Sequence, residues 1–235
     1  MNENKIFNII KKTVLDLHKE ARKYQKRKDK NKKSKIKYGR SPSLSNYFEE
    51  NFVNELSKIY KQYLFYIDYP IHLYDSKGNT LKNSQNKSQN IYPDIIITDK
   101  EDILKAIIEL KMDIGHIDLK EFNFKRERNL LKAKFGELNP IVGKYSRKKY
   151  KTKKIGIHFP KKFKKILIVV TLVNQHTFKG HPKSNKYKKI MEKHHYKPLF
   201  LLEKNHYNFY DDLTTDIESE IDKKRGDIIK VFKGL

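Results

Sequence analysis

Three charged residues stand in an otherwise apolar stretch of the chain, between positions 92 and 113, and their types suit the hydrolysis of a phosphodiester. Asp94 precedes the run Ile-Ile-Ile-Thr, and Glu109 and Lys111 follow the run Ile-Leu-Lys-Ala-Ile-Ile. Two carboxylates can hold Mg²⁺, which takes oxygen ligands, activates water and offsets charge on phosphorus oxygens. Lys111 can orient or deprotonate the attacking water. The backbone carbonyl of Leu110, between the two active side chains, is expected as a third metal ligand.

The same stretch predicts a β-hairpin that would bring these residues together. Two β-branched, apolar runs are joined by the turn residues 99–102. The start of the first strand then lies near the end of the second. Asp94 is at the start of the first strand, and Glu109 and Lys111 are at the end of the second, so the three residues are neighbours. Because side chains alternate along a strand, Glu109 and Lys111 share one face and Leu110 points to the opposite face. Burying such charges is costly, which favours a functional role for them.

Two helices are predicted before the hairpin. Apolar residues at helical spacing predict an amphipathic helix over residues 5–25, followed by a basic segment, 26–37, that is either a solvated linker or an arm that wraps DNA. A second amphipathic helix is expected over residues 44–62. Glu49 and Glu55 lie at the two margins of its apolar face, where a carboxylate can reach a site beside a sheet.

The remaining apolar runs predict a mixed β-sheet with helices on its faces, which is an α/β fold. The sequence contains no internal repeat and no linker that would divide it. We therefore expect a single domain over residues 1–235: an N-terminal helix and basic arm (1–40), a core (41–173), and a C-terminal strand and helices (174–235). The further expected elements are a strand over 63–74 bent at Pro70, a polar loop over 75–90, a helix over 118–135 stopped by Gly136, a buried strand over 166–173, a helix over 184–195, a strand over 198–202 and a helix over 211–232.

The charge balance favours a polyanionic partner. Lys and Arg number 53 against 28 Asp and Glu, a formal net charge of +25, which suits nucleic acid or an anionic membrane surface, although a bias toward Lys, Asn and Ile also inflates this charge. The densest basic tract, residues 144–165, contains no acid. Lysine contacts to phosphates would make DNA binding sensitive to salt, and base reading would need Arg, Asn or Gln in a groove. We expect DNA contacts from Arg126, Arg128, Arg147, Lys148, Lys149, Lys151, Lys153 and Lys154.

Several classes of protein are disfavoured by what the sequence lacks. Without cysteine there is no disulfide framework or thiolate metal site, and the histidines lack the spacing of a zinc site. The sequence has no Walker motif for nucleotide-driven translocation, no signal peptide and no membrane-spanning run. A cytoplasmic protein without a membrane partner is expected.

The residues Pro93-Asp94 and Glu109-Leu110-Lys111 resemble the paired motif of the PD-(D/E)xK nuclease superfamily, which includes many type II restriction endonucleases. The resemblance covers roughly residues 41–173. It implies a restriction-endonuclease-like core of order αβββαβ and Mg²⁺-dependent cleavage, with Mn²⁺ as a substitute. It also implies that Asp94 and Glu109 bind the metal, that Lys111 assists the water, and that a helix glutamate helps to hold a metal. Phe48-Glu49 resembles that last position, with Glu55 as the second choice.

The function expected from this resemblance is that of a Mg²⁺-dependent endodeoxyribonuclease, specifically a type II site-specific restriction endonuclease. Such an enzyme would act as a homodimer on double-stranded DNA, beside a cognate DNA methyltransferase in the same cell. Another nuclease with the same core, such as a junction resolvase, a nicking enzyme or a phage-defence nuclease, is the first alternative. A non-catalytic, basic DNA- or RNA-binding protein is the alternative from a different class.

Overall fold

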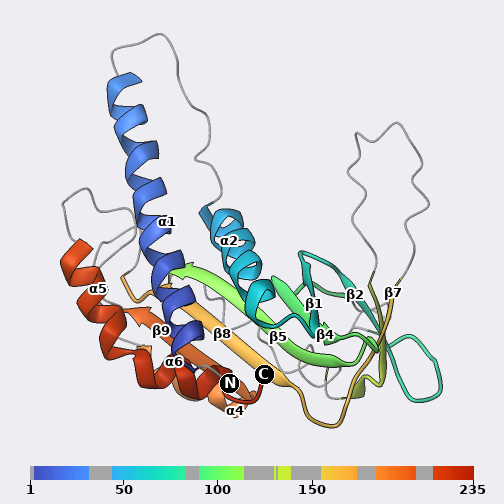
Figure 1. The fold of residues 1–235 in the computed structure, drawn as a ribbon. Helices are drawn as coiled ribbons and strands as arrows, with labels where there is room; N and C mark the ends of the chain where they lie inside the picture. Colours follow the sequence, from blue (N-terminus) through green and yellow to red (C-terminus); the bar gives the residue numbers. More distant parts are fainter. Residues whose placement is uncertain are drawn as a thin grey trace.

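The computed structural model describes residues 3–31, 44–82, 90–113, 130, 132–138, 155–173, 184–204 and 214–235. These residues form a mixed α/β structure with two sheets and five helices (Figure 1). None of the described helices is both long enough and apolar enough to cross a membrane.

The larger sheet has five strands in the order β1-β4-β5-β8-β9. Antiparallel pairing joins β1 to β4 and β4 to β5, whereas β5, β8 and β9 run parallel. The central strands β5 and β8 are almost wholly buried because helices cover one face of the sheet, and a further helix and the smaller sheet cover the other. The bounds of the five strands are β1 Tyr63–Ile67, β4 Ile95–Asp99, β5 Leu104–Asp113, β8 Lys164–Thr171 and β9 Tyr196–Leu202.

Four helices lie on one face of this sheet and one lies on the other. Ile108 and Ile168 of the sheet belong to a core that also contains Ile10 of α1, Phe52 of α2 and Phe232 of α6. On the opposite face, α4 packs over β8 and β9 (Figure 1). The bounds of the helices are α1 Glu3–Asn31, α2 Leu44–Ile59, α4 Ser184–Lys193, α5 Thr214–Lys223 and α6 Arg225–Phe232.

Polar contacts join the first helix to the last two. Lys11 Nζ lies 2.8 Å from Asp222 Oδ1 and 3.4 Å from Glu218 Oε2. Arg225 Nη2 donates to Asn4 Oδ1 at 2.7 Å. Helices α1 and α6 thus close the main core between positions far apart in the sequence, and Figure 1 shows the start of α1 beside α6.

A smaller antiparallel sheet has the strand order β3-β2-β6-β7. It packs against the face of the hairpin that points away from α1 and α2. A Cβ at Gly136 in β6 would lie 2.6 Å from a side-chain carbon of Ile71 and 2.8 Å from a ring carbon of Phe159, so only glycine fits there. The bounds are β2 Ile71–Tyr74, β3 Asn90–Ile91, β6 Phe135–Leu138 and β7 Ile155–His158.

Most of the expected local elements are confirmed, among them the hairpin, the two N-terminal helices and the buried strand β8. Helix α1 is longer than expected, because it continues to Asn31 into the basic segment, the rest of which lies outside the described residues. The expected helix over 118–135 lies largely outside the described residues as well. Its last residue, Phe135, belongs to a strand, so Gly136 does not stop a helix.

Three predictions about the fold were wrong. The stretch 63–74 forms two strands in different sheets, because the chain turns at Asp68, with a φ of 56°, before Pro70. The single expected sheet is therefore two sheets. The expected helix over 211–232 is two helices separated at Lys224, and its first three residues lie outside the described part of the chain.

Candidate active site

The register of the hairpin places Asp94 directly opposite Glu109. Ile95 pairs with Ile108 and Ile96 with Ile107, so the next pair outward is Asp94 with Glu109. Lys111 lies two residues further along the same face of β5. The register of the hairpin therefore brings the three side chains to one face, as predicted.

The Lys111 ammonium group lies close to both carboxylates. Lys111 Nζ is 4.0 Å from Asp94 Oδ2 and 3.9 Å from Glu109 Oε2. The exposed fraction is 3% for the Glu109 side chain, 20% for Asp94 and 22% for Lys111. Glu109 thus forms the floor of the site, and Asp94 and Lys111 form the rim that solvent or a substrate reaches first.

Pro93 and Asp94 change the backbone hydrogen bonding of Leu110 on the opposite strand. The backbone N–H of Leu110 donates to Asp94 Oδ2 at 2.5 Å. The N–H and C=O of one residue point to the same side of a strand, so the Leu110 carbonyl also faces β4. In the hairpin register its partner would be Pro93, which has no N–H to donate. The Leu110 carbonyl, which was expected as a metal ligand, therefore lies on the side of β5 that faces Asp94.

Glu49 is buried beside this set. It lies on α2 with an exposed fraction of only 5%, next to Phe48 and Phe52 of the main core. Burial, the largest cause, and the negative charges of Asp94 and Asp68 together raise the pKa of Glu49 to about 8, although the positive charge of Lys111 opposes them. The structure therefore brings Glu49 within electrostatic reach of the hairpin carboxylates.

Glu55, the second choice for the helix carboxylate, has a different environment. Its Oε1 accepts hydrogen bonds from Lys58 at 2.9 Å and from Lys12 at 3.3 Å on the surface between α1 and α2. The Lys58 hydrogen bond lowers the pKa of Glu55. Of the two candidates, Glu49 is the one whose carboxylate interacts with the site.

Oxygen donors for a hard cation are present in the site. Asp94 and Glu109 supply two carboxylates and Leu110 a carbonyl, a set that fits Mg²⁺, which commonly keeps waters in its other positions. Among the described residues, no group of three or more His, Cys, Asp or Glu side chains is arranged around a single point that would suit a metal ion. The lysine beside the pair would make it less unfavourable to ionise both carboxylates.

Part of the basic tract has a structural role. Arg126, Arg128, Arg147, Lys148, Lys149, Lys151, Lys153 and Lys154 all lie outside the described residues. The last two lysines of the tract 144–165 make contacts within the protein. Lys165 is buried and donates to the His194 carbonyl at 2.5 Å, and Lys164 donates to the carbonyls of Val231 and Lys233.

Asp68 is a site residue that the sequence did not indicate. Its backbone N–H donates to the Asp94 carbonyl at 3.0 Å, and its charge acts on Glu49. The φ of 56° is uncommon for a residue other than glycine, though Asp tolerates it. Asp before Tyr-Pro is a turn signal, but only the fold shows that this turn supports Asp94.

Replacing Glu49 by Gln is expected to reduce the dependence of stability on pH. In the folded protein Glu49, with a pKa of about 8, keeps a proton that the unfolded chain releases near its ordinary value of 4.5. The free energy of unfolding of the wild type should therefore fall as pH rises between these values, by up to roughly 1.4 kcal/mol per pH unit. Glutamine stays neutral, so the free energy of unfolding of the variant lacks this decrease. The difference in free energy of unfolding between the variant and the wild type should therefore shift in favour of the variant from pH 5 to pH 8.

Urea unfolding of both proteins at pH 5, 6.5 and 8 measures this difference. Glu50→Gln is the matched control, because Glu50 is the exposed neighbour of Glu49 on the same helix. Parallel stability curves for the wild type and Glu49→Gln would show that Glu49 is ionised at neutral pH.

In comparisons with known proteins, the chain matches no family model, no curated protein and no solved structure.

Proposed function

We propose that this protein is a Mg²⁺-dependent endodeoxyribonuclease with a restriction-endonuclease-like core. The observation that carries the proposal is the juxtaposition of Asp94, Glu109 and Lys111, with Lys111 Nζ within 4.0 Å of both carboxylates. The element order also supports it, because α2 is followed by the antiparallel strands β1, β4 and β5, and then by β8 parallel to β5.

The residues divide the chemistry between the floor and the rim of the site. A bound Mg²⁺ would supply a polarised water and positive charge for the phosphate oxygens. Asp94, Glu109 and the Leu110 carbonyl would hold the ion, and Glu49 would release its proton and add a further carboxylate as the cation approaches. Lys111, on the solvent side, would orient the attacking water with its ammonium group and would face the scissile phosphate.

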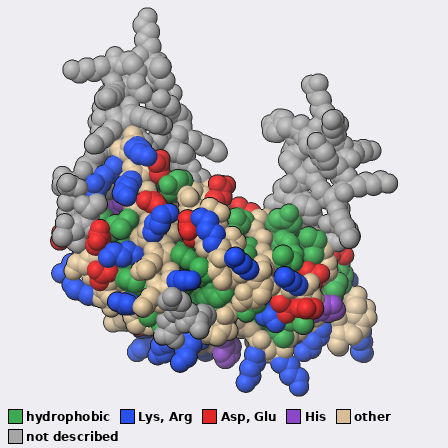
Figure 2. Space-filling view, viewed as in Figure 1, with side chains coloured by type: hydrophobic (Ala, Val, Ile, Leu, Met, Phe, Trp, Pro, Cys, Tyr) green, Lys and Arg blue, Asp and Glu red, His purple; other side chains and the backbone are tan. Residues whose placement is uncertain are grey.

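Double-stranded DNA is the proposed substrate, and a type II restriction endonuclease the proposed class. The net charge of +25 favours a polyanion, and Lys and Arg side chains are spread over the face shown in Figure 2, with acidic side chains between them. One site per chain suits a homodimer that cuts both strands of a palindromic sequence. A cognate methyltransferase would then protect the DNA of the same cell.

Incubation with supercoiled plasmid, genomic DNA and four-way junctions tests the proposal. Discrete fragments that appear with Mg²⁺ and disappear with EDTA would support a restriction enzyme, and sequencing the fragment ends would give the target and the cut position. Cleavage of junctions alone would indicate a resolvase with the same core. DNA left intact at every salt concentration, but bound, would indicate a non-catalytic binding protein.

A further inference from the structure

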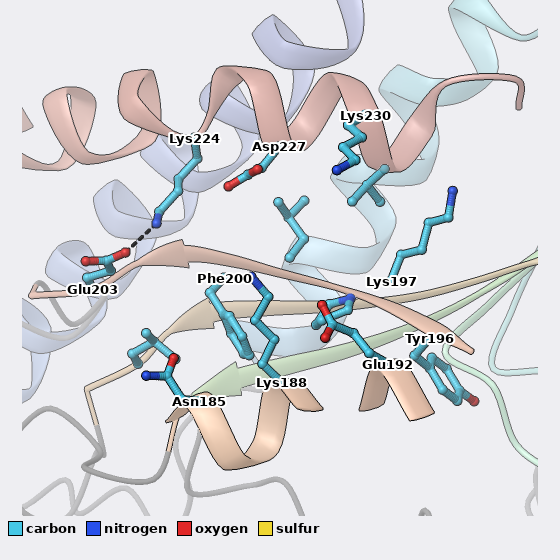
Figure 3. Close-up of a pocket in the computed structure, with 14 residues that line it drawn as sticks. Asn185, Lys188, Glu192, Tyr196, Lys197, Phe200, Glu203, Lys224, Asp227 and Lys230 are labelled. Carbon is cyan, nitrogen blue, oxygen red and sulfur yellow. Dashed lines mark hydrogen bonds and ion pairs between the residues drawn. The ribbon is translucent and has the colours of Figure 1, made fainter. Parts of the chain in front are cut away.

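Two surfaces outside the candidate active site could receive a ligand, and their chemistry differs. A groove of about 640 Å³ runs along β9 between α4 and α6 (Figure 3). Lysines and carboxylates both line this groove, and two of them, Lys224 and Glu203, already form an ion pair, so its charge favours no single class of ligand. The outer face of the smaller sheet, which Figure 1 shows away from β9, has a more selective composition.

Three aromatic rings form a row across this outer face. Tyr74 of β2 pairs with Phe135 of β6, and Phe135 pairs with His158 of β7, so the three side chains lie on one face of the sheet. The ring centroids of Tyr74 and Phe135 are 5.8 Å apart, and those of Phe135 and His158 are 5.4 Å apart. Leu73 and Leu138 belong to the core, so the aromatic row lies on the face that points away from it.

Part of each ring in the row is accessible. Tyr74 and Phe135 are half-buried, and His158 is exposed. A Cβ at Gly156 would lie 2.7 Å from a ring carbon of Phe135, so the ring lies over the backbone of β7 at a position where glycine leaves room for it. Accessible rings on the face of a sheet suit the stacking of nucleobases, because every base has a π face.

Exposed lysines lie at the end of the sheet that carries the row. Lys77 is in the turn after β2, Lys134 directly precedes β6, and Lys161 lies three residues after β7. Because these strands are antiparallel, the three positions are at the same end of the sheet. The carboxylate of that turn, Asp75, accepts hydrogen bonds from the backbone N–H groups of Lys77 and Asn79. The lysines therefore place positive charge at the margin of the row, where the phosphates of a stacked strand would lie.

We propose that this face of the smaller sheet binds single-stranded DNA, with bases stacked on Tyr74, Phe135 and His158 and with phosphates along the lysines. Glu137 lies two residues after Phe135 on the same face, and its charge repels phosphates, so bases and not phosphates lie over the centre of the sheet. Stacking of this kind tolerates any base, so the binding does not depend on sequence.

A strand bound on this face would lie near the candidate active site. Strand β3 belongs to the same sheet, and only Tyr92 and Pro93 separate its end from Asp94. Tyr92 is 58% exposed, which offers a further ring between the sheet and the site. The choice of DNA over RNA, and any use of this face during cleavage, rests on the proposed function, whereas the stacking itself does not.

Fluorescence anisotropy of a labelled dT oligonucleotide of about 12 nucleotides, measured in EDTA, tests the proposal without cleavage. An abasic oligonucleotide of the same length keeps the phosphates and removes the bases. The wild type is expected to bind the dT oligonucleotide at least about 10-fold more tightly than the abasic one. Phe135→Leu and Tyr74→Leu keep apolar bulk and remove a ring. Each should weaken binding of the dT oligonucleotide at least about 5-fold and leave binding of the abasic one unchanged.

Phe65→Leu is the matched control, because Phe65 is a half-buried aromatic residue on β1 of the larger sheet. It should bind both oligonucleotides as the wild type does. Circular dichroism shows whether each variant is folded, and His158→Ala, at an exposed position, tests the row if either leucine variant is not.

Equal affinity of the wild type for the dT and abasic oligonucleotides would reduce the binding to phosphate contacts and overturn the proposal. Unchanged binding by the folded variants would overturn it as well, and tighter binding of an oligo(U) RNA of the same length would overturn the choice of DNA. A protein that binds the dT oligonucleotide through these rings but cleaves no DNA would refute the proposed function alone.

Discussion

Replacing Glu109 by Gln, or Asp94 by Asn, is expected to lower the rate of DNA cleavage at least about 10³-fold, since each change removes a charge that would hold the cation in the transition state. Both replacements keep the size of the side chain. In Asp94→Asn the amide oxygen can still accept the hydrogen bond from the Leu110 N–H, and Glu109→Gln removes a charge from a side chain that is 3% exposed. Fold stability should therefore change little.

Single-turnover cleavage of a plasmid measures the loss, and a gel-shift assay measures DNA binding in Ca²⁺, which is expected to support binding without cleavage. The matched control is Glu101→Gln, an exposed carboxylate in the turn of the same hairpin, which should cleave as the wild type does. Cleavage within about 10-fold of wild type in either site variant would refute the assignment of the carboxylates.

Lys111→Met is expected to lower the rate of DNA cleavage roughly 10²- to 10⁴-fold, while DNA binding is retained. Methionine keeps most of the aliphatic length of the side chain and removes the ammonium group 3.9–4.0 Å from the two carboxylates. Without that cation, ionising Asp94, Glu109 and Glu49 together becomes less favourable, because Lys111 lowers the pKa of Glu49 in the wild type.

The same two assays measure this result, with Lys105→Met as the control. Lys105 lies on the same strand, near the turn of the hairpin, and forms an ion pair with Asp99 at 2.6 Å. It should be dispensable for cleavage. An active Lys111→Met variant would contradict the proposed role, and a variant that lost DNA binding as well would assign Lys111 to binding instead of to chemistry.

The local elements around the site follow from the sequence, because their signals are local. The β-branched runs and the turn at residues 99–102 specify the hairpin, and once the hairpin forms, its register alone sets Asp94 opposite Glu109. The burial of Glu49 could not be predicted from the sequence. A glutamate at the margin of an apolar face is equally compatible with solvent, and only the packing of α2 on the sheet decides between them.

The division into two sheets could not be derived from sequence patterns. Strand β2 leaves the sheet of β1 after the turn at residues 68–70, and its partners β3 and β6 come from segments whose pairing is non-local. A bend at Pro70 was predicted, but a bend does not specify the strand with which the following residues pair. The break at Lys224 is similar, because the run Lys-Lys-Arg-Gly at 223–226 is a weak stop signal inside an otherwise helical pattern.

The contacts between α1 and the two C-terminal helices have a consequence for the timing of synthesis. Lys11 pairs with Asp222, and Asn4 with Arg225, so the main core closes between segments that leave the ribosome first and more than 200 positions later. Until α6 emerges, the apolar side of α1 and of the sheet lacks part of its cover. We therefore expect the candidate active site to take its final arrangement only after this helix is made.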